Sequence, residues 1–227
     1  MLQFGRCRLL VATIVVALIS LPARSQDVKL EEGHTSLFNG KDLTGWVYGK
    51  TATGENKAGA GYAVENGAIF CTVRDGGNLY TAKEYADFSF RFEFKLTENA
   101  NNGIGIRAPL LGDAAYVGME IQVLDDSGSN NRNLRPEQYH GSIYNLVGSK
   151  RGSQKPVGEW NSQEIEAKGT RIKVTLNGTM ILDTDLADIK DEAKLRRHPG
   201  IKNAKGHIGF LGHGARVEFR NLRIKEL

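Results

Sequence analysis

The sequence has few of the features that cross-link a chain or mark a cofactor site. Two cysteines occur in 227 residues, and Cys7 lies in an N-terminal segment that we expect to be removed. Cys71 would then be alone, which excludes an intrachain disulfide and leaves stability to the hydrophobic core. There is no internal repeat, no low-complexity linker and no nucleotide-binding fingerprint, so we expect no nucleotide cofactor.

Long apolar runs are also missing beyond the N-terminus. Arg6 and Arg8 form a positive region, residues 9–21 an apolar run, and residues 23–25 a small-x-small cleavage site. This order predicts a cleaved secretory signal peptide over residues 1–25. The run is shorter than the roughly 20 residues that a membrane-spanning helix needs. We therefore expect a periplasmic or extracellular protein with no stable membrane insertion after cleavage.

A strong charge of either sign is absent as well. The formal net charge of +4 falls to +1 when the signal peptide takes Arg6, Arg8 and Arg24 with it. The electrostatic footprint of a nucleic-acid-binding protein is therefore missing, and we predict no nucleic-acid partner. Residues 26–227 suffice for one sizeable core and are predicted to form a single domain.

What the sequence does contain is apolar alternation with a period of two. In Asp87–Leu96 the four phenylalanines and the leucine share one face, opposite polar residues, as in a strand with one face in a core. Helical signal is weak and limited to residues 188–197. The pattern predicts an all-β, antiparallel two-sheet sandwich. Its other expected features are strands at 161–168, 170–176, 179–183, 207–211 and 215–224, a two-residue turn at Asn177-Gly178, and a bulge near Arg220-Asn221.

The strand expected at Tyr116–Asp125 is the most informative for function. Side chains alternate along a strand, so Glu120 and Gln122 project to one side, while Met119, Ile121 and Val123 project to the other. A carboxylate and an amide in a row on an otherwise apolar strand indicate the wall of a polar binding groove. A half-exposed strand with a solvated outer face is the alternative.

Seven segments together resemble the 3-keto-disaccharide hydrolase domain family, also described as a 3-keto-glucoside-1,2-lyase and 3-keto-2-hydroxy-glucal hydratase domain. The resemblance runs in order along the whole chain after the signal peptide, and it implies a jelly roll like those of concanavalin A and laminarinase. The segments are Ser36–Trp46, Asn101–Arg107, Gly118–Asp125, Gly141–Tyr144, Lys155–Asn161, Gly206–Gly214 and Val217–Ile224.

The acids of the central strand do not favour ordinary glycoside hydrolysis. Retaining glycosidases of this fold place two carboxylates about 5–5.5 Å apart, whereas here Gln122 stands at the central acid position and Asp125 is expected on the opposite face. The resemblance instead implies cleavage of 3-keto-glycosides. A base removes the C2 proton, the glycosidic oxygen leaves from C1, and water then adds. Such a reaction needs a base, an electrophile and a proton donor.

The candidate residues follow from the resemblance and from their chemistry. Glu120, His140 and His213 are candidate bases, and Arg107 is a candidate electrophile; Gln122, Tyr144, Lys155 and Asn102 are candidates for substrate binding. The resemblance also implies a divalent metal (Mn, Co, Zn or Ca, which the sequence does not distinguish), with Glu120, His140 and His213 as ligands. Residues 125–131 could alternatively form a calcium loop or a plain solvated loop.

The sequence leaves three functions open. The first is an exported hydrolase or lyase acting on an oligosaccharide or a 3-keto-glycoside. Its keto substrate would require an upstream sugar 3-dehydrogenase. The second is a non-catalytic, lectin-like carbohydrate-binding module, and the third a structural or adhesion domain. The enzyme requires Arg107, Glu120, His140 and His213 to converge, whereas a binding module needs only aromatic platforms and amides.

Overall fold

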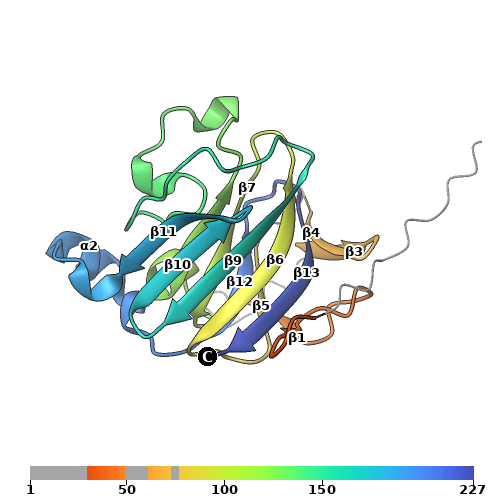
Figure 1. Cartoon of the computed structure of the whole chain (residues 1–227), viewed down its shortest axis with the longest axis horizontal. Helices are drawn as coiled ribbons and strands as arrows, with labels where there is room; N and C mark the ends of the chain where they lie inside the picture. Colours follow the sequence, from red (N-terminus) through yellow and green to blue (C-terminus); the bar gives the residue numbers. More distant parts are fainter. Residues whose placement is uncertain (1–29, 50–60, 73–76) are drawn as a thin grey trace, which may run out of the picture.

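Two antiparallel β-sheets packed face to face form the protein (Figure 1). The structure is a computed structural model, and it describes residues 30–49, 61–72 and 77–227. The expected signal peptide lies outside these residues. The fold class predicted from apolar alternation is confirmed.

Sheet A faces the viewer in Figure 1 and is the larger layer. Within the described residues its strand order is β11-β10-β9-β6-β13-β4-β3, with β1 paired to β13. Its strands are β1 (Thr35–Ser36), β3 (Tyr62–Glu65), β4 (Ala68–Cys71), β6 (Phe88–Leu96), β9 (Trp160–Lys168), β10 (Arg171–Leu176), β11 (Thr179–Asp185) and β13 (Val217–Glu226).

Sheet B lies behind sheet A, in the order β2-β5-β12-β7-β8. Its strands are β2 (Trp46–Tyr48), β5 (Gly77–Thr81), β7 (Asn101–Ala108), β8 (Met119–Leu124) and β12 (His207–Gly212). Short helices cover the connections: α1 (Ala114–Val117), α2 (Glu192–Arg197), η1 (Ser129–Asn131), η2 (Pro136–Gln138), η3 (Leu186–Asp188) and η4 (Pro199–Lys202).

The core lies between the two sheets and is centred on β6. Phe88, Phe90, Phe92 and Phe94 are fully buried, as their alternation predicts. The ring of Phe92 stacks on Phe90 with centroids 4.9 Å apart. Sheet B supplies the facing layer, including Ile104, Ile121 and Phe210. Burial of these aromatic and aliphatic side chains is the main favourable contribution to folding.

The predicted turn and bulge are confirmed. Asn177 and Gly178 both have positive φ, 49° and 83°, which a two-residue hairpin turn with matching twist requires. The pairing of β13 with β6 shifts register between Arg220 and Arg223, and Asn221 there has a φ of 53°. The helix or turn expected at 188–197 is present as the end of η3 and as α2.

Predicted strand ends differ from the observed ones by up to three residues, and the largest difference is at the start of β8. The strand expected from Tyr116 begins at Met119, because Tyr116 and Val117 belong to the helical turn α1. Asp113 caps this turn: its Oδ1 accepts a hydrogen bond from the backbone N–H of Ala115 at 3.1 Å. A cap of this kind competes with strand extension.

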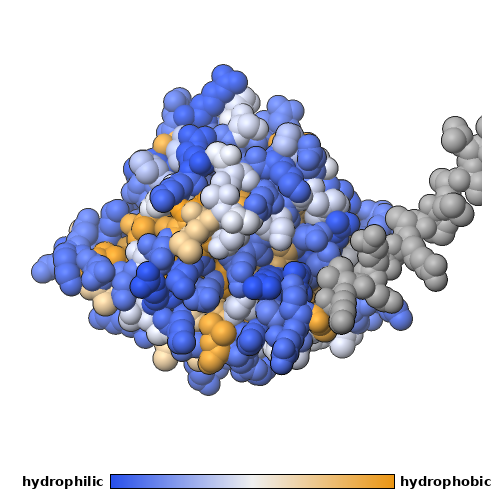
Figure 2. Space-filling view, in the orientation of Figure 1, coloured by the Kyte–Doolittle hydropathy of each residue, from blue (hydrophilic) through white to orange (hydrophobic). Residues whose placement is uncertain are grey.

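The viewed surface of the sandwich is largely hydrophilic (Figure 2). Ion pairs follow the outer face of sheet A, such as Lys173–Glu166 at 2.8 Å and Arg220–Glu93 at 2.7 Å. In the part of the chain that the structure describes, no helix has the length and apolar character to cross a membrane.

We predict that Phe92→Ala destabilises the protein by about 3–5 kcal/mol, because it leaves a cavity among fully buried rings. Lys173→Ala, which removes a half-exposed ion pair, should cost about 0–1 kcal/mol. Urea unfolding measures both. A loss below about 1 kcal/mol for Phe92→Ala would contradict the assignment of the core.

Candidate functional site

The outer face of sheet B, which we define as the face turned away from the core, carries the candidate site. On β8, Met119, Ile121 and Val123 lie in the core, so Glu120 and Gln122 project from the outer face. All six residues of β8 are buried. Protein atoms therefore cover this side of the strand. Of the two alternatives, the wall of a binding groove agrees with this burial, whereas a solvent-exposed outer face does not.

A further extended segment lengthens this face beyond β8. Ile143 pairs with Ile121 in an antiparallel bridge, and the backbone N–H of Tyr144 donates to the Glu120 carbonyl oxygen at 2.9 Å. Ile143 is in the core, so the register places Tyr144 on the outer face beside Glu120. Glu120 and Gln122, the two residues expected to form a binding wall, thus lie on one face with Tyr144, a separate candidate for substrate binding.

Glu120 is the most unusual group on this face. Its side chain is buried, with 4% of the residue exposed. Among the described residues its Oε1 has no hydrogen-bond partner. Burial raises the pKa of Glu120 to about 8, and the Asp113 carboxylate adds to this effect. A carboxyl group held in this state can exchange a proton near neutral pH.

Asp113 lies close enough to Glu120 and to His213 to influence the charge state of each. The Asp113 carboxylate acts electrostatically on both residues. Desolvation by surrounding atoms lowers the pKa of the His213 imidazole, and Asp113 opposes this shift. Asp113 was not among the predicted site residues: its sequence pattern is that of a helix cap, and nothing in the linear sequence directs it towards Glu120.

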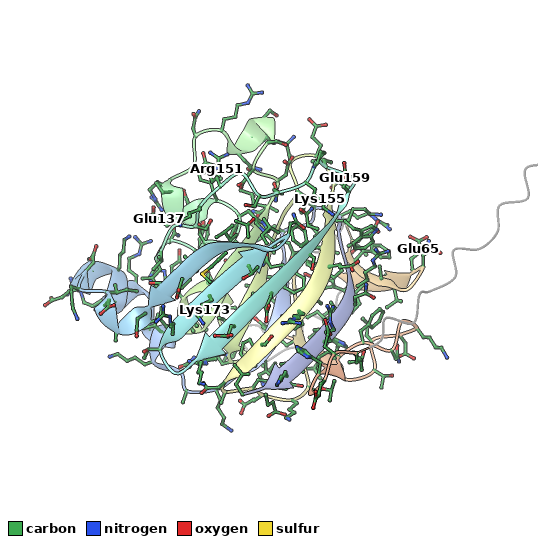
Figure 3. All side chains as sticks on the ribbon, in the orientation of Figure 1. Glu65, Glu137, Arg151, Lys155, Glu159 and Lys173 are labelled. Atoms are coloured by element: carbon green, nitrogen blue, oxygen red, sulfur yellow. The ribbon has the colours of Figure 1, made fainter. Side chains whose placement is uncertain are left out.

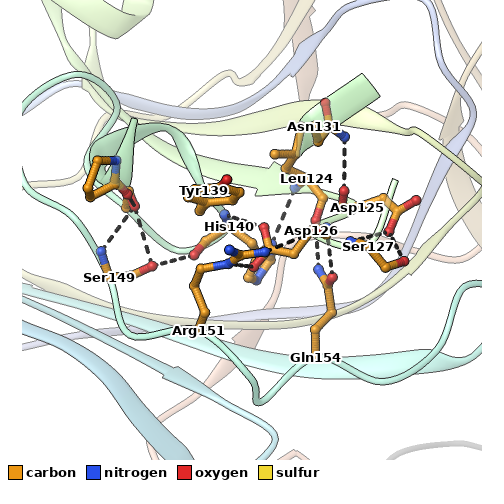
Figure 4. A network of polar contacts seen from close by, with 12 residues as sticks. Leu124, Asp125, Asp126, Ser127, Asn131, Tyr139, His140, Ser149, Arg151 and Gln154 are labelled. Carbon is orange, nitrogen blue, oxygen red and sulfur yellow. Dashed lines mark hydrogen bonds and ion pairs between the residues drawn. The ribbon is translucent and has the colours of Figure 1, made fainter. Parts of the chain in front are cut away.

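His140 lies elsewhere, between the two sheets. Its Nδ1 accepts a hydrogen bond from the Leu124 backbone N–H at 3.3 Å, and its Nε2 lies 2.8 Å from Gln163 Oε1. These partners assign the proton to Nε2 of a neutral ring. The ring stacks on Phe94, and burial lowers its pKa. Figure 4 shows His140 within the loop network that holds the 125–154 region.

Arg107 is separate from Glu120 as well. Its φ is 47°, at the point where the pairing of β7 and β12 shifts register, so its side chain leaves the regular alternation. The guanidinium donates to the carbonyl oxygens of Ala86 (2.9 Å) and Gly169 (2.7 Å) and to Asp87 Oδ1 (2.9 Å). Arg107 therefore joins the start of β6 to the β9–β10 turn.

The other two substrate-binding candidates also lie away from the outer face. Lys155 Nζ donates to the Trp160 carbonyl oxygen at 2.9 Å. It lies at the end of sheet A, near Glu159 (Figure 3). Asn102 is fully buried on the core side of β7 and donates to the Tyr62 hydroxyl at 3.2 Å. Asn102 is adjacent to Gly103 of the outer face, so strand alternation turns its side chain into the core, where its role is structural.

The residues present do not fit the expected metal site. His140 uses both ring nitrogens in the core, so Glu120, His140 and His213 are not brought to one point. Residues 30–49, 61–72 and 77–227 contain no group of three His, Cys, Asp or Glu residues placed to hold an ion. Asp125 is not available as a ligand for the alternative calcium loop. Its two carboxylate oxygens accept hydrogen bonds from Asn99 and Ser127.

The outer face also has a support that the sequence analysis missed. His198 is buried; its Nδ1 lies 2.8 Å from the Lys194 carbonyl oxygen and its Nε2 lies 3.2 Å from that of Tyr144. It connects α2 to the segment that carries Tyr144. Its sequence context, a basic stretch before a proline, indicates a surface residue.

Comparison with known proteins identifies relatives along most of the chain. A family model described as a 3-keto-alpha-glucoside-1,2-lyase-like domain matches residues 33–225. A 3-keto-disaccharide hydrolase of Bacteroides thetaiotaomicron is 26% identical over 234 residues, covering 86% of this chain and 79% of that protein.

Solved structures agree with this fold. A protein of Parabacteroides distasonis, provisionally assigned as a glycosyl hydrolase, is 28% identical, with a TM-score of 0.71 over 86% of this chain and 94% of the other. A Bacillus subtilis protein with a galectin-like fold is 13% identical, with a TM-score of 0.53, and covers 81% of this chain and 90% of its own. That second likeness concerns the fold alone.

We predict that Arg107→Met lowers stability by about 3 kcal/mol, because it removes the donor of three hydrogen bonds and leaves the carbonyl oxygens of Ala86 and Gly169 without this partner. It should leave the pH dependence of activity unchanged, since Arg107 does not contact Glu120. Arg171→Met, which breaks an exposed pair with Asp183, is the control and should leave stability nearly unchanged. Urea unfolding and pH–rate profiles measure these effects. If Arg107→Met changed the pH dependence of activity without lowering stability, Arg107 would be a residue of the active site and the structural assignment would be wrong.

The raised pKa of Glu120 predicts a pH-dependent stability. Below pH 4.5 the Glu120 carboxyl is protonated in both the folded protein and the unfolded chain. Between pH 4.5 and about pH 8 it loses its proton only in the unfolded chain. The free energy of unfolding therefore falls as pH rises through this window. Glu120→Gln should remove that fall, on the order of a few kcal/mol, since one pKa unit is about 1.4 kcal/mol.

The measurement is urea unfolding of both proteins at several pH values from 4.5 to 8. The Glu120→Gln variant should gain stability over the parent steadily across this range. Glu166→Gln, on the outer face of sheet A, is the matched control and should show no such gain. Parallel pH curves for the parent and Glu120→Gln would contradict the raised pKa.

Proposed function

Because this chain belongs to the family of 3-keto-alpha-glucoside-1,2-lyase-like domains, we propose that it is a hydrolase that cleaves 3-keto-glycosides on the outer face of sheet B. One observation carries the assignment of the site. Glu120 is a buried carboxyl with a pKa of about 8, its Oε1 has no hydrogen-bond partner within residues 30–49, 61–72 and 77–227, and it lies on the face that also presents Gln122 and Tyr144.

Glu120 is the proposed general base. The ketone at C3 acidifies the hydrogen on C2, and the Glu120 carboxylate takes this proton while the C–H electron pair forms an enediolate. The enediolate then expels the glycosidic oxygen from C1, and water adds to the resulting enone to give net hydrolysis. A base with a pKa near the working pH combines an adequate ionised fraction with proton affinity.

Tyr144 and His213 are the proposed proton donors to the leaving group. The register places Tyr144 beside Glu120, and His213 shares the electrostatic neighbourhood of Asp113. Gln122 donates one amide N–H to Asn101 Oδ1 at 2.9 Å, and its second amide N–H would bind a sugar hydroxyl. No step in this scheme uses Arg107, His140, Lys155 or a metal ion.

The cellular setting belongs to the same proposal. The N-terminal pattern of basic residues, apolar run and small-x-small site supports export to the periplasm or exterior. A 3-keto-glycoside must be produced by oxidation of a sugar hydroxyl at C3. This chain carries no nucleotide-binding fingerprint, so a separate sugar 3-dehydrogenase would act upstream.

Proton NMR of the purified protein with a 3-keto-glucoside in D2O tests the proposal. We expect loss of the C2 proton signal together with release of the aglycone. The initial rate should rise with pH towards about 8, as Glu120 ionises. Glu120→Gln should lower the rate by about 10²–10⁴-fold, the usual contribution of a general base.

Glu166→Gln is the control and should keep the parent rate. Chelator-treated protein is run alongside, and an unchanged rate would agree with the scheme above, whereas a lost rate restored by Mn, Co, Zn or Ca would place a metal in it. An intact substrate whose signals only broaden on titration would indicate a lectin-like binding module and overturn the enzyme assignment.

A further inference from the structure

The Glu120 carboxyl group occupies the space where a side chain of Gly103 would begin. A Cβ built on Gly103 would lie 1.9 Å from Glu120 Oε1 and 2.6 Å from its Cδ and Cγ. Ordinary contacts of a Cβ begin at about 3.4 Å. The side chain of Glu120 therefore lies flat across β7, directly on the backbone of Gly103.

The strand register shows which β7 residue the Glu120 side chain contacts. Gly105 is the residue directly opposite Glu120, and Gly103 is opposite Gln122. Glu120 thus leans diagonally along the strand, over the residue two positions away from its direct partner. Diagonal neighbours in antiparallel pairs are within reach of a long side chain.

The backbone does not itself need a glycine at Gly103. Its φ lies outside the positive region, and it sits within the regular pairing of β7 with β8. Glycine in a strand interior costs conformational entropy and marks a close approach to the backbone. The approaching group here is the carboxyl of Glu120.

We propose that Gly103 is a positioning residue for the reaction, and that its missing side chain makes the slot that holds the Glu120 carboxyl buried and aimed at the outer face. The catalytic part of this inference depends on the proposed role of Glu120 as base; the slot itself does not. Any side chain at position 103 displaces the carboxyl towards solvent.

Displacement has two measurable consequences. A more solvated carboxyl has a pKa closer to 4.5, because burial is the main cause of the raised value. A base moved by about 1 Å or more loses its alignment with the C2 proton, which can cost about 10²-fold in rate. The fold should survive, since all three colliding atoms belong to one flexible side chain and none to the backbone.

The experiment compares Gly103→Ala with Gly105→Ala. Both add one methyl group to the same face of β7, but at Gly105 the methyl meets Leu211 Cδ2 at 3.2 Å and Tyr80 Cε1 at 3.5 Å instead of Glu120. Carbon-13 NMR of glutamate-labelled protein follows the carboxyl titration, with Glu120→Gln assigning the signal.

We expect the Glu120 midpoint to fall from about 8 towards 4.5 in Gly103→Ala and to stay in place in Gly105→Ala. The pH–rate profile of Gly103→Ala should shift with it, and its kcat should fall by about 10²-fold. An unmoved Glu120 midpoint with parent-like kcat in a folded Gly103→Ala protein would overturn the inference.

A double variant keeps the test decisive if Gly103→Ala folds poorly. Glu120→Ala removes the colliding atoms, so Gly103→Ala should be tolerated in that background, with a thermal midpoint close to that of Glu120→Ala alone. An equal loss in both backgrounds would contradict the slot. If Glu120→Gln keeps full activity while the Gly103→Ala midpoint still moves, the slot stands and the catalytic role fails.

Discussion

The packing of the β6 phenylalanine ladder against sheet B is the constraint on which the rest of the structure depends. It determines which face of each strand is internal, and the pleat then assigns every second residue to the opposite face. On β8 the apolar residues are drawn inward. Glu120 and Gln122 must therefore project from the outer face, so the position of the site is a consequence of the core.

The Glu120 carboxyl on the outer face of sheet B lowers the stability of the protein, so stability does not explain its presence. A buried carboxylate costs free energy, the more so because its Oε1 has no hydrogen-bond partner among the described residues, and this cost favours the neutral form of Glu120. The core between the sheets offsets this cost. The glycine beneath the carboxyl adds a further entropic cost. Local features that oppose stability commonly mark functional positions, and here two of them coincide at Gly103 and Glu120.

The histidines show how one residue type takes separate roles in this fold. His140 is a neutral core residue with both nitrogens engaged, and His198 joins a helix to an extended segment. His213 alone of these three keeps solvent contact, and the Asp113 carboxylate acts on its partly desolvated imidazole. Burial and available partners, rather than the imidazole itself, separate a structural histidine from a candidate proton donor.

The sequence by itself determined the sandwich, the strand phase of β6 and β8, the Asn177-Gly178 turn and the β13 bulge, because these depend on alternation and on local backbone preferences. It also identified Glu120, Gln122 and Tyr144 as candidates. Only the tertiary structure decided that Arg107, His140, Lys155 and Asn102 lie apart from them, and that Asp113 lies near. Register shifts, such as the one at Arg107, and contacts between residues far apart in sequence, such as His140 with Gln163, leave no periodic signal.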